Sequence, residues 1–135
     1  MSSLLLAFGF SWMVVGAVIG LFVGHQHERH VQQLDEIAVR GSLAEYHRAQ
    51  DGYRRRVVLH AHSFLFPLVA IVVGLVMPQL AYPATGIVAL GIALMVAAPV
   101  WTLGGLRSFV PLMALGDILL LGSIVATAIG LARGL

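Results

Sequence analysis

Apolar residues dominate four long stretches of this sequence, separated by one long polar segment and two short ones. The apolar stretches run over about residues 4–24, 57–77, 84–103 and 110–132. Each has close to the roughly 20 apolar residues that an α-helix needs to cross the hydrocarbon core of a bilayer. The sequence therefore predicts four membrane-spanning helices within a single membrane domain over 1–135.

The long polar segment, residues 25–56, also repeats its apolar positions at helical spacing. Gly41 interrupts the repeat, and Ser42 followed by Glu45 has the pattern of a capping box at a helix N-terminus. We therefore expect a helical hairpin that continues spans one and two beyond the membrane and turns near Gly41.

Charges support this hairpin. Antiparallel pairing about the turn brings Glu28 beside Arg55 and Asp35 beside Arg48, so opposite charges meet across it. An exposed ion pair contributes only about 0–1 kcal/mol. The pairs therefore indicate the register of the two arms rather than a source of stability.

Short connections follow the second and third spans, so neighbouring helices are expected to pack antiparallel. Small residues recur at helical spacing at Gly16, Gly20 and Gly24, and they predict a close packing seam because lipid offers little hydrophobic drive between helices. The expected fold is all-α: an integral membrane four-helix bundle with a cytoplasmic helical hairpin extending spans one and two.

Arginines are distributed unevenly between the two predicted sides of the membrane. The side with the hairpin and the 104–109 loop carries seven, against Arg133 alone on the other: Arg29, Arg40, Arg48, Arg54, Arg55, Arg56 and Arg107. The positive-inside rule then predicts a multi-pass protein of the inner (cytoplasmic) membrane, with loop 25–56 cytoplasmic and both termini outside.

Composition narrows the possible functions. Hydrophobic residues make up 59% of the chain and charged residues 10%, whereas soluble domains carry about 25% charged residues. The chain has no cysteine, which excludes disulfides, cysteine-held zinc, iron–sulfur clusters and thiol chemistry. The arginines are interleaved with acids, so the partner we expect is a lipid bilayer and not a nucleic acid.

All six histidines lie between His25 and His62. In His60-Ala61-His62 the two imidazoles are two residues apart, or about 200° around a helix, so they must face different neighbours. We expect His60 to face span one, toward His25 and His27. His62 should then face span four and its carboxylate, Asp117.

At 1.5 Å per residue, both His62 and Asp117 are expected about 9 Å below the cytoplasmic face. An ionisable residue inside a span is a functional candidate. The residues proposed as metal ligands near this face are His25, His27, His60, His62 and Asp117. Four other interpretations stay open: interfacial histidines that only satisfy their polar atoms, a structural hydrogen bond or ion pair of Asp117, Asp117 as a partner that orients a ligand histidine, and a proton relay without metal.

The motif His60-Ala61-His62, followed by an aromatic and leucine run over residues 63–66, resembles one in small four-span bacterial membrane proteins. These are akin to part of the catalytic subunit of haem–copper oxidases. In the large oxidases such a motif serves two haems from opposite faces of one helix. The resemblance implies haem ligation by His60 and His62, with His25 as a candidate partner.

Three functions follow from these patterns. The first is binding of haem b or a transition metal ion (copper, iron or zinc) near the cytoplasmic face, for redox or electron transfer. The second is a small proton-coupled transporter or channel that uses Asp117 and His62. The third is a non-catalytic subunit or assembly factor of a larger membrane complex, with partners that are copies of this chain or other subunits. Whether the protein is an enzyme stays open.

Overall fold

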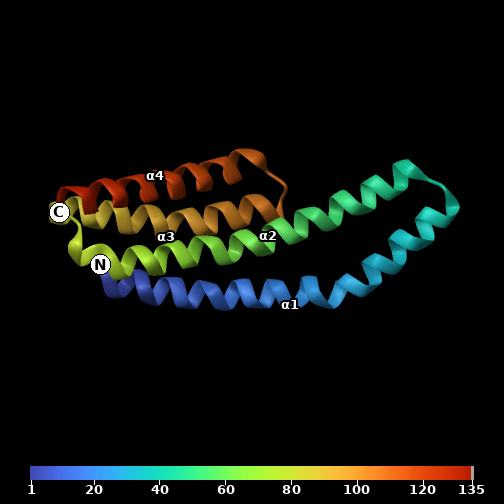
Figure 1. The fold of residues 1–135 in the computed structure, drawn as a ribbon, viewed down its shortest axis with the longest axis horizontal. Helices are drawn as coiled ribbons and strands as arrows, with labels where there is room; N and C mark the ends of the chain where they lie inside the picture. Colours follow the sequence, from blue (N-terminus) through green and yellow to red (C-terminus); the bar gives the residue numbers. More distant parts are fainter. Residues whose placement is uncertain (135) are drawn as a thin grey trace.

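The computed structural model describes residues 1–134, which form long α-helices and no strand (Figure 1). The elements are α1 (Ser2–Arg40), α2 (Leu43–Val76), the short 3-10 helix η1 (Met77–Gln79), α3 (Ala84–Leu106) and α4 (Val110–Gly134). All four α-helices are long and apolar enough to cross a membrane. The all-α four-helix prediction is confirmed, and the chain is a multi-pass membrane protein.

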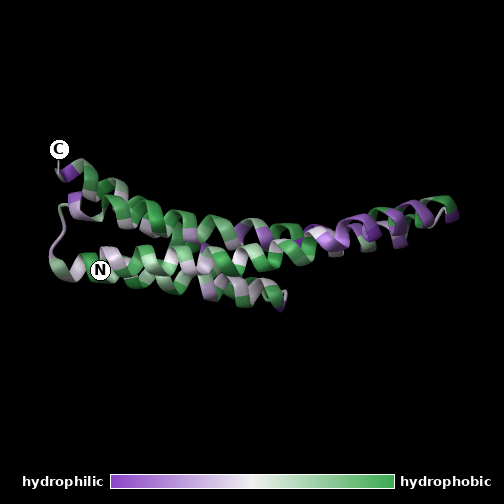
Figure 2. Cartoon of the chain, turned by 90° about the horizontal axis from the view of Figure 1, so that it is seen from below, coloured by the Kyte–Doolittle hydropathy of each residue, from purple (hydrophilic) through white to green (hydrophobic). Residues whose placement is uncertain are grey.

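The first two helices are much longer than a bilayer requires. α1 has 39 residues, or about 58 Å at 1.5 Å per residue, against about 30 Å of hydrocarbon. α2 has 34 residues and runs back beside α1. Their shared extension is the hairpin at the end of the molecule away from both termini (Figure 1). Hydrophilic positions concentrate there, while the bundle is mainly hydrophobic (Figure 2).

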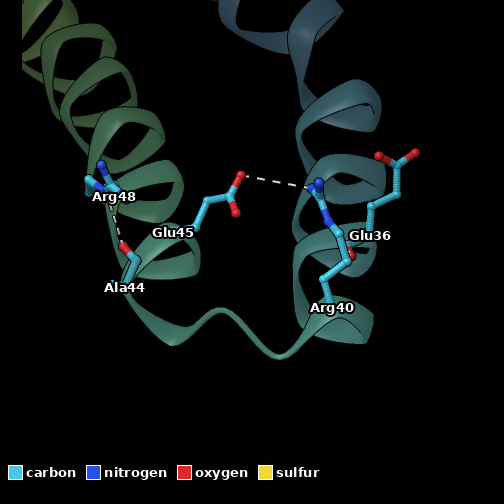
Figure 3. Close-up of polar contacts among 5 residues, drawn as sticks. All are labelled: Glu36, Arg40, Ala44, Glu45 and Arg48. Carbon is cyan, nitrogen blue, oxygen red and sulfur yellow. Dashed lines mark hydrogen bonds and ion pairs between the residues drawn. The ribbon is translucent and has the colours of Figure 1, made fainter.

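The hairpin turns where the sequence predicted. Gly41 has φ 72°, and its N–H donates to the carbonyl of Ala38 at 3.1 Å. This left-handed conformation favours glycine, because a Cβ would be strained there. The predicted capping box is not formed, since the side chain of Ser42 makes no capping hydrogen bond. The carboxylate of Glu45 is turned instead toward Arg40, with Nη2 and Oε1 3.8 Å apart (Figure 3).

The two ion pairs predicted across the hairpin, Glu28 with Arg55 and Asp35 with Arg48, are absent from residues 1–134. That prediction was wrong. Arg48 donates from Nε to the carbonyl of Ala44, one turn back on its own helix, at 3.3 Å (Figure 3). Exposed ion pairs gain little over hydration, so a local hydrogen bond satisfies the guanidinium equally well.

The helices lie side by side in sequence order, with α1 packed on α2, α3 packed on α4, and the two pairs joined mainly through α2 and α3 (Figure 1). The core lies along α2 and α3 and includes Phe66, Leu94 and Trp101, each 2% exposed. In the most apolar window of each helix, 39% of α3 is buried but only 17% of α1. The outer surface of α1 is therefore available to lipid.

Glycines bring α1 and α2 together along a contact that we call the α1–α2 seam, formed by Gly9, Gly16 and Gly20 against Ile71, Ser63 and His60. A Cβ on Gly16 would lie 3.0 Å from the carbonyl oxygen of Ser63, and one on Gly20 would overlap the ring of His60. Nothing lies within 4 Å of a Cβ on Gly24. The predicted seam is thus correct at Gly16 and Gly20 and wrong at Gly24, which has no such neighbour on α2.

Candidate functional site

His60 is held in the seam between α1 and α2. Its ring packs over Gly20 and meets Phe64 edge-on, with ring centroids 5.1 Å apart. Its Nδ1 atom is buried and has no hydrogen-bond partner. His60 therefore faces span one as predicted, but it meets a glycine there and not a second histidine.

His62 faces a different helix. Its ring lies flat on that of Trp101 in α3, with centroids 4.1 Å apart and planes 2° apart. Its Nδ1 is 2.9 Å from the carbonyl oxygen of Val58. Because a carbonyl only accepts, Nδ1 carries the proton, and Nε2 is left to accept one. The two histidines have different neighbours, as the spacing required, but the helix that His62 contacts is α3 and not α4.

The other histidines lie in or next to the hairpin. A hydrogen bond of 2.6 Å joins His27 Nδ1 to the hydroxyl of Tyr53, and His30 stacks on the same ring with centroids 4.2 Å apart. Burial lowers the pKa of His30, and the positive charges of Arg56 and His27 lower it further. These contacts extend the α1–α2 packing beyond the glycines. His25 is exposed.

Asp117 lies on an exposed face of α4. The neighbouring Gly116 packs on Trp101, since a Cβ there would lie 2.6 Å from the Cβ of Trp101, and this contact turns the carboxylate of Asp117 away from α3. Within residues 1–134, no three His, Asp or Glu side chains are grouped closely enough to hold a metal ion. The structure therefore does not bring His25, His27, His60, His62 and Asp117 together as one group, and metal binding by them stays a prediction from the sequence.

A cleft of about 460 Å³ lies between α2, α3 and α4, next to the loop between α3 and α4. Figure 1 shows α2 leaving the bundle beside this loop. We call it the α2–α4 cleft. It is lined by Asp51, Arg54, Arg55, Val58 and Leu59 of α2, Trp101 and Gly105 of α3, Ser108 of the loop, and Val110 and Met113 of α4. Its volume is in the usual range of ligand pockets, about 300–1,000 Å³.

His62 and Asp117 do not line this cleft, but each lies one helical turn beyond a lining residue, toward the middle of the bundle. His62 follows Val58 by one turn on α2, and Asp117 follows Met113 by one turn on α4. Residues four apart share a helix face. The sequence analysis had linked His62 to Asp117 but missed the cleft between them. The spacing of Asp51, Arg55, Val58 and His62 along one face of α2 was the signal that could have revealed it.

Charges at the mouth of the cleft are mainly positive. Arg54 and Arg55 are exposed lining residues, and Asp51 is exposed beside them. Within the described chain neither arginine is in an ion pair. Arg56 points to the opposite side, where its Nη1 donates to Oε1 of Gln26 on α1. Of the three consecutive arginines, two thus face the cleft and the third faces α1.

Comparison with protein-family models, curated proteins and solved structures gives no match for this chain. The resemblance of the histidine motif to haem–copper oxidases therefore stays a prediction from sequence. The function has to be argued from the cleft, the seam and the hairpin of the chain itself.

Proposed function

We propose that this chain moves protons as a small proton-coupled transporter or channel, with the α2–α4 cleft as its cytoplasmic entrance. The main support is that His62 and Asp117 follow the lining residues Val58 and Met113 by one helical turn, on the same faces of α2 and α4. Ionisable side chains within spans are costly, and they mark ion pathways when they face a water-filled cavity. A wet cleft accounts for the exposure of Asp117 without placing its charge in lipid.

Both residues have an atom that can carry a proton. His62 keeps one proton on Nδ1 for its backbone carbonyl, so that Nε2 can accept a second from water. The carboxylate of Asp117 can accept and release a proton in the same way. α3, which packs between them, has no titratable side chain. The other charges facing the cleft are those of Asp51, Arg54 and Arg55 at its mouth.

The orientation in the membrane is part of the proposal. Seven of the eight arginines lie in the hairpin or in the loop between α3 and α4. Positive charge favours the cytoplasmic side, so the mouth of the cleft would open to the cytoplasm. Both termini would then lie on the outer side of the inner membrane.

The test is proton flux into liposomes that contain the purified protein, driven by a potassium-diffusion potential and read with a trapped pH dye. We expect Asp117→Asn and His62→Gln each to reduce the flux about tenfold, the effect of about 1.4 kcal/mol on a barrier. Glu36→Gln and His47→Gln change exposed groups of the hairpin and should conduct like the unmodified protein. Equal flux in protein-containing and empty liposomes, with or without a long-chain anion, would contradict the proposal.

A second candidate function is docking to another subunit through the tip of the hairpin. Val39 is 90% exposed and Leu43 69% exposed in an otherwise polar region. Apolar side chains exposed this far from lipid are typical of a binding surface. The variant with both Val39→Ser and Leu43→Ser should lose the oligomer or complex mass of the unmodified protein in mild detergent, while its proton flux stays unchanged.

The haem or transition-metal hypothesis stays a prediction from the sequence. The positions of His25, His60 and His62 do not support a shared site, because His60 packs on α1, His62 stacks on α3, and His25 is exposed. An absorption spectrum and an elemental analysis of the purified protein decide the matter. A Soret band lost in His60→Ala or His62→Ala would restore the redox function.

A further inference from the structure

The walls of the α2–α4 cleft change from charged to apolar with depth. Arg54, Arg55 and Ser108 line its mouth, and Val58, Leu59 and Met113 line its interior. This division matches a ligand with a charged head and a hydrocarbon chain, because each part would meet surface of its own kind.

The sign of the head follows from the arginines. Within residues 1–134 neither Arg54 nor Arg55 is in an ion pair, and the one acid at the mouth, Asp51, leaves the lining with a net positive charge. A guanidinium presents several N–H donors in a planar fork that fits a carboxylate or phosphate group. An anionic head would accept hydrogen bonds from these guanidinium groups and offset their positive charge. A zwitterionic head has no net charge, so it would offset that charge less well.

The interior fits a chain. From Arg54 to His62 the wall formed by α2 extends about 12 Å at 1.5 Å per residue. The ring of Trp101, 2% exposed, lies along this path. A groove between α3 and α4 on the other side of α4, lined by Tyr82, Gly86, Ala93 and Gly122 among others, has no charged residue. That groove therefore lacks the means to select an anion.

The backbone at the mouth of the cleft is strained at one residue. Ser108 has φ 54°, a conformation that costs a non-glycine residue about 1–2 kcal/mol. Strained residues that persist in a fold are concentrated at ligand sites. Here the strained turn places a serine in the lining of the cleft mouth, beside the arginines.

We propose that the α2–α4 cleft binds an anionic amphiphile, with its carboxylate or phosphate head at Arg54 and Arg55 and its hydrocarbon chain along Val58, Leu59 and Trp101. The inference rests on the proposed function, in which the cleft is an entrance, and the molecule that enters it is an anionic amphiphile. The head could belong to a phospholipid of the bilayer or to a free long-chain anion, and the two sources share this chemistry.

The test uses the fluorescence of Trp101. The chain has two tryptophans, so Trp12→Phe, a change on α1 outside the cleft, leaves Trp101 as the only one. Dodecyl phosphate and dodecylphosphocholine with the same brominated chain are titrated against this protein in a neutral detergent. We expect the anionic compound to quench half of the Trp101 fluorescence at a concentration about tenfold lower than the zwitterionic one. This ratio corresponds to a difference of about 1.4 kcal/mol in binding free energy. Equal concentrations for the two compounds would overturn the proposal.

The neighbouring arginine provides the matched control. Arg55→Gln and Arg54→Gln should remove the preference for the anionic compound. Arg56→Gln removes the same charge one residue further along but on the side facing Gln26, so it should keep the preference. If all three variants behave alike, the preference comes from general surface charge, and the proposed site is wrong.

Two further binding experiments distinguish a phospholipid of the bilayer from a free long-chain anion as the natural ligand. Brominated phosphatidylglycerol, compared with brominated phosphatidylcholine in nanodiscs, tests a bilayer lipid. A brominated long-chain fatty acid, compared with the corresponding alcohol, tests a free anion. Anion-selective quenching in either arm supports the proposal, and its absence from both overturns it. Because this experiment measures binding only, it can succeed when the proton-flux experiment fails, and the reverse is also true.

Discussion

α2 makes two very different contacts along its length. On one side the α1–α2 seam is closed, because a Cβ on Gly16 or Gly20 would already meet Ser63 or His60. On another side the α2–α4 cleft is open, with about 460 Å³ between its walls. The same helix therefore seals one face and exposes another.

The comparison explains why two histidines separated by one residue are assigned different roles. His60 is in the closed seam, where its ring fills space over Gly20. His62 lies one turn beyond Val58 of the cleft lining and keeps an acceptor nitrogen. We infer that a titratable group becomes functional here through access to water and not through depth in the membrane.

The largest effect is expected from breaking the seam. Gly16→Leu forces a side chain against the backbone of α2, and overpacking of this kind costs about 1–3 kcal/mol. Gly24→Leu is the matched control, because nothing lies within 4 Å of a Cβ there. Thermal unfolding in detergent should show a lower Tm for the first variant and little change for the second. Equal effects would mean that the seam is not closed.

The next prediction concerns the rim of the cleft. Ser108→Gly relieves a positive φ and should raise the free energy of unfolding by up to about 1 kcal/mol, partly offset by the greater freedom of glycine in the unfolded chain. The same variant should bind the anionic amphiphile no more tightly than the unmodified protein. Destabilisation on this substitution would show that the turn is not strained.

A smaller effect is expected in the hairpin, where Tyr53 and His30 continue the closed contact. The lowered pKa of His30, caused first by burial, means that the unfolded hairpin binds a proton more readily than the folded one. The hairpin should keep its full stability above the ordinary pKa of 6.5 and lose stability as the pH falls below that value. Amide hydrogen exchange of α1 and α2 residues near Tyr53, corrected for the intrinsic exchange rates, should therefore become faster as the pH is lowered from about 7.5 to about 5.5.

His30→Phe keeps an aromatic ring against Tyr53 and cannot take up the proton, so it should flatten this dependence on pH. His47→Gln removes an exposed imidazole and should leave the dependence as it is. An unchanged slope in His30→Phe would assign the effect to another group.

The smallest effect is expected at the tip. Glu45→Gln removes the ion pair with Arg40, whose side chain is 60% exposed, and exposed pairs contribute about 0–1 kcal/mol. Denaturant unfolding should detect no more than a few tenths of a kcal/mol. A larger loss would show that the tip is held by this contact and not by the turn at Gly41.

The fold could be predicted because it depends on local information. The lengths of the apolar stretches define the spans, and Gly41 marks the turn, since only the left-handed conformation closes the hairpin there. The spacing of His60 and His62 also predicted that they face different neighbours.

The site could be predicted only in part, because it depends on how each helix is rotated about its axis. Gly116 packs on Trp101, and this contact decides that the adjacent Asp117 is exposed. The sequence placed Asp117 and His62 at one depth but could not show that Trp101 covers the histidine ring or that a cleft separates the two walls. These features come from tertiary packing of residues far apart in the chain.

Cysteine accessibility tests the central claim most directly, because the chain has no cysteine of its own. Single cysteines replace Met113, Asp117 and Ile118 in turn, and each protein is treated in vesicles with a charged, membrane-impermeant thiol reagent. The reaction requires a thiolate, which forms in water and not in lipid. Ile118 is 68% exposed and is turned about 100° from Asp117 around α4, where it lines the uncharged groove between α3 and α4 and not the α2–α4 cleft.

We predict that Met113→Cys and Asp117→Cys react from the hairpin side at least about tenfold faster than Ile118→Cys, since charged groups avoid the hydrocarbon. Protection of both by dodecyl phosphate would tie this access to the proposed ligand. Reaction of Ile118→Cys as fast as Asp117→Cys, or of none of the three, would show that the cleft does not carry water to the level of Asp117.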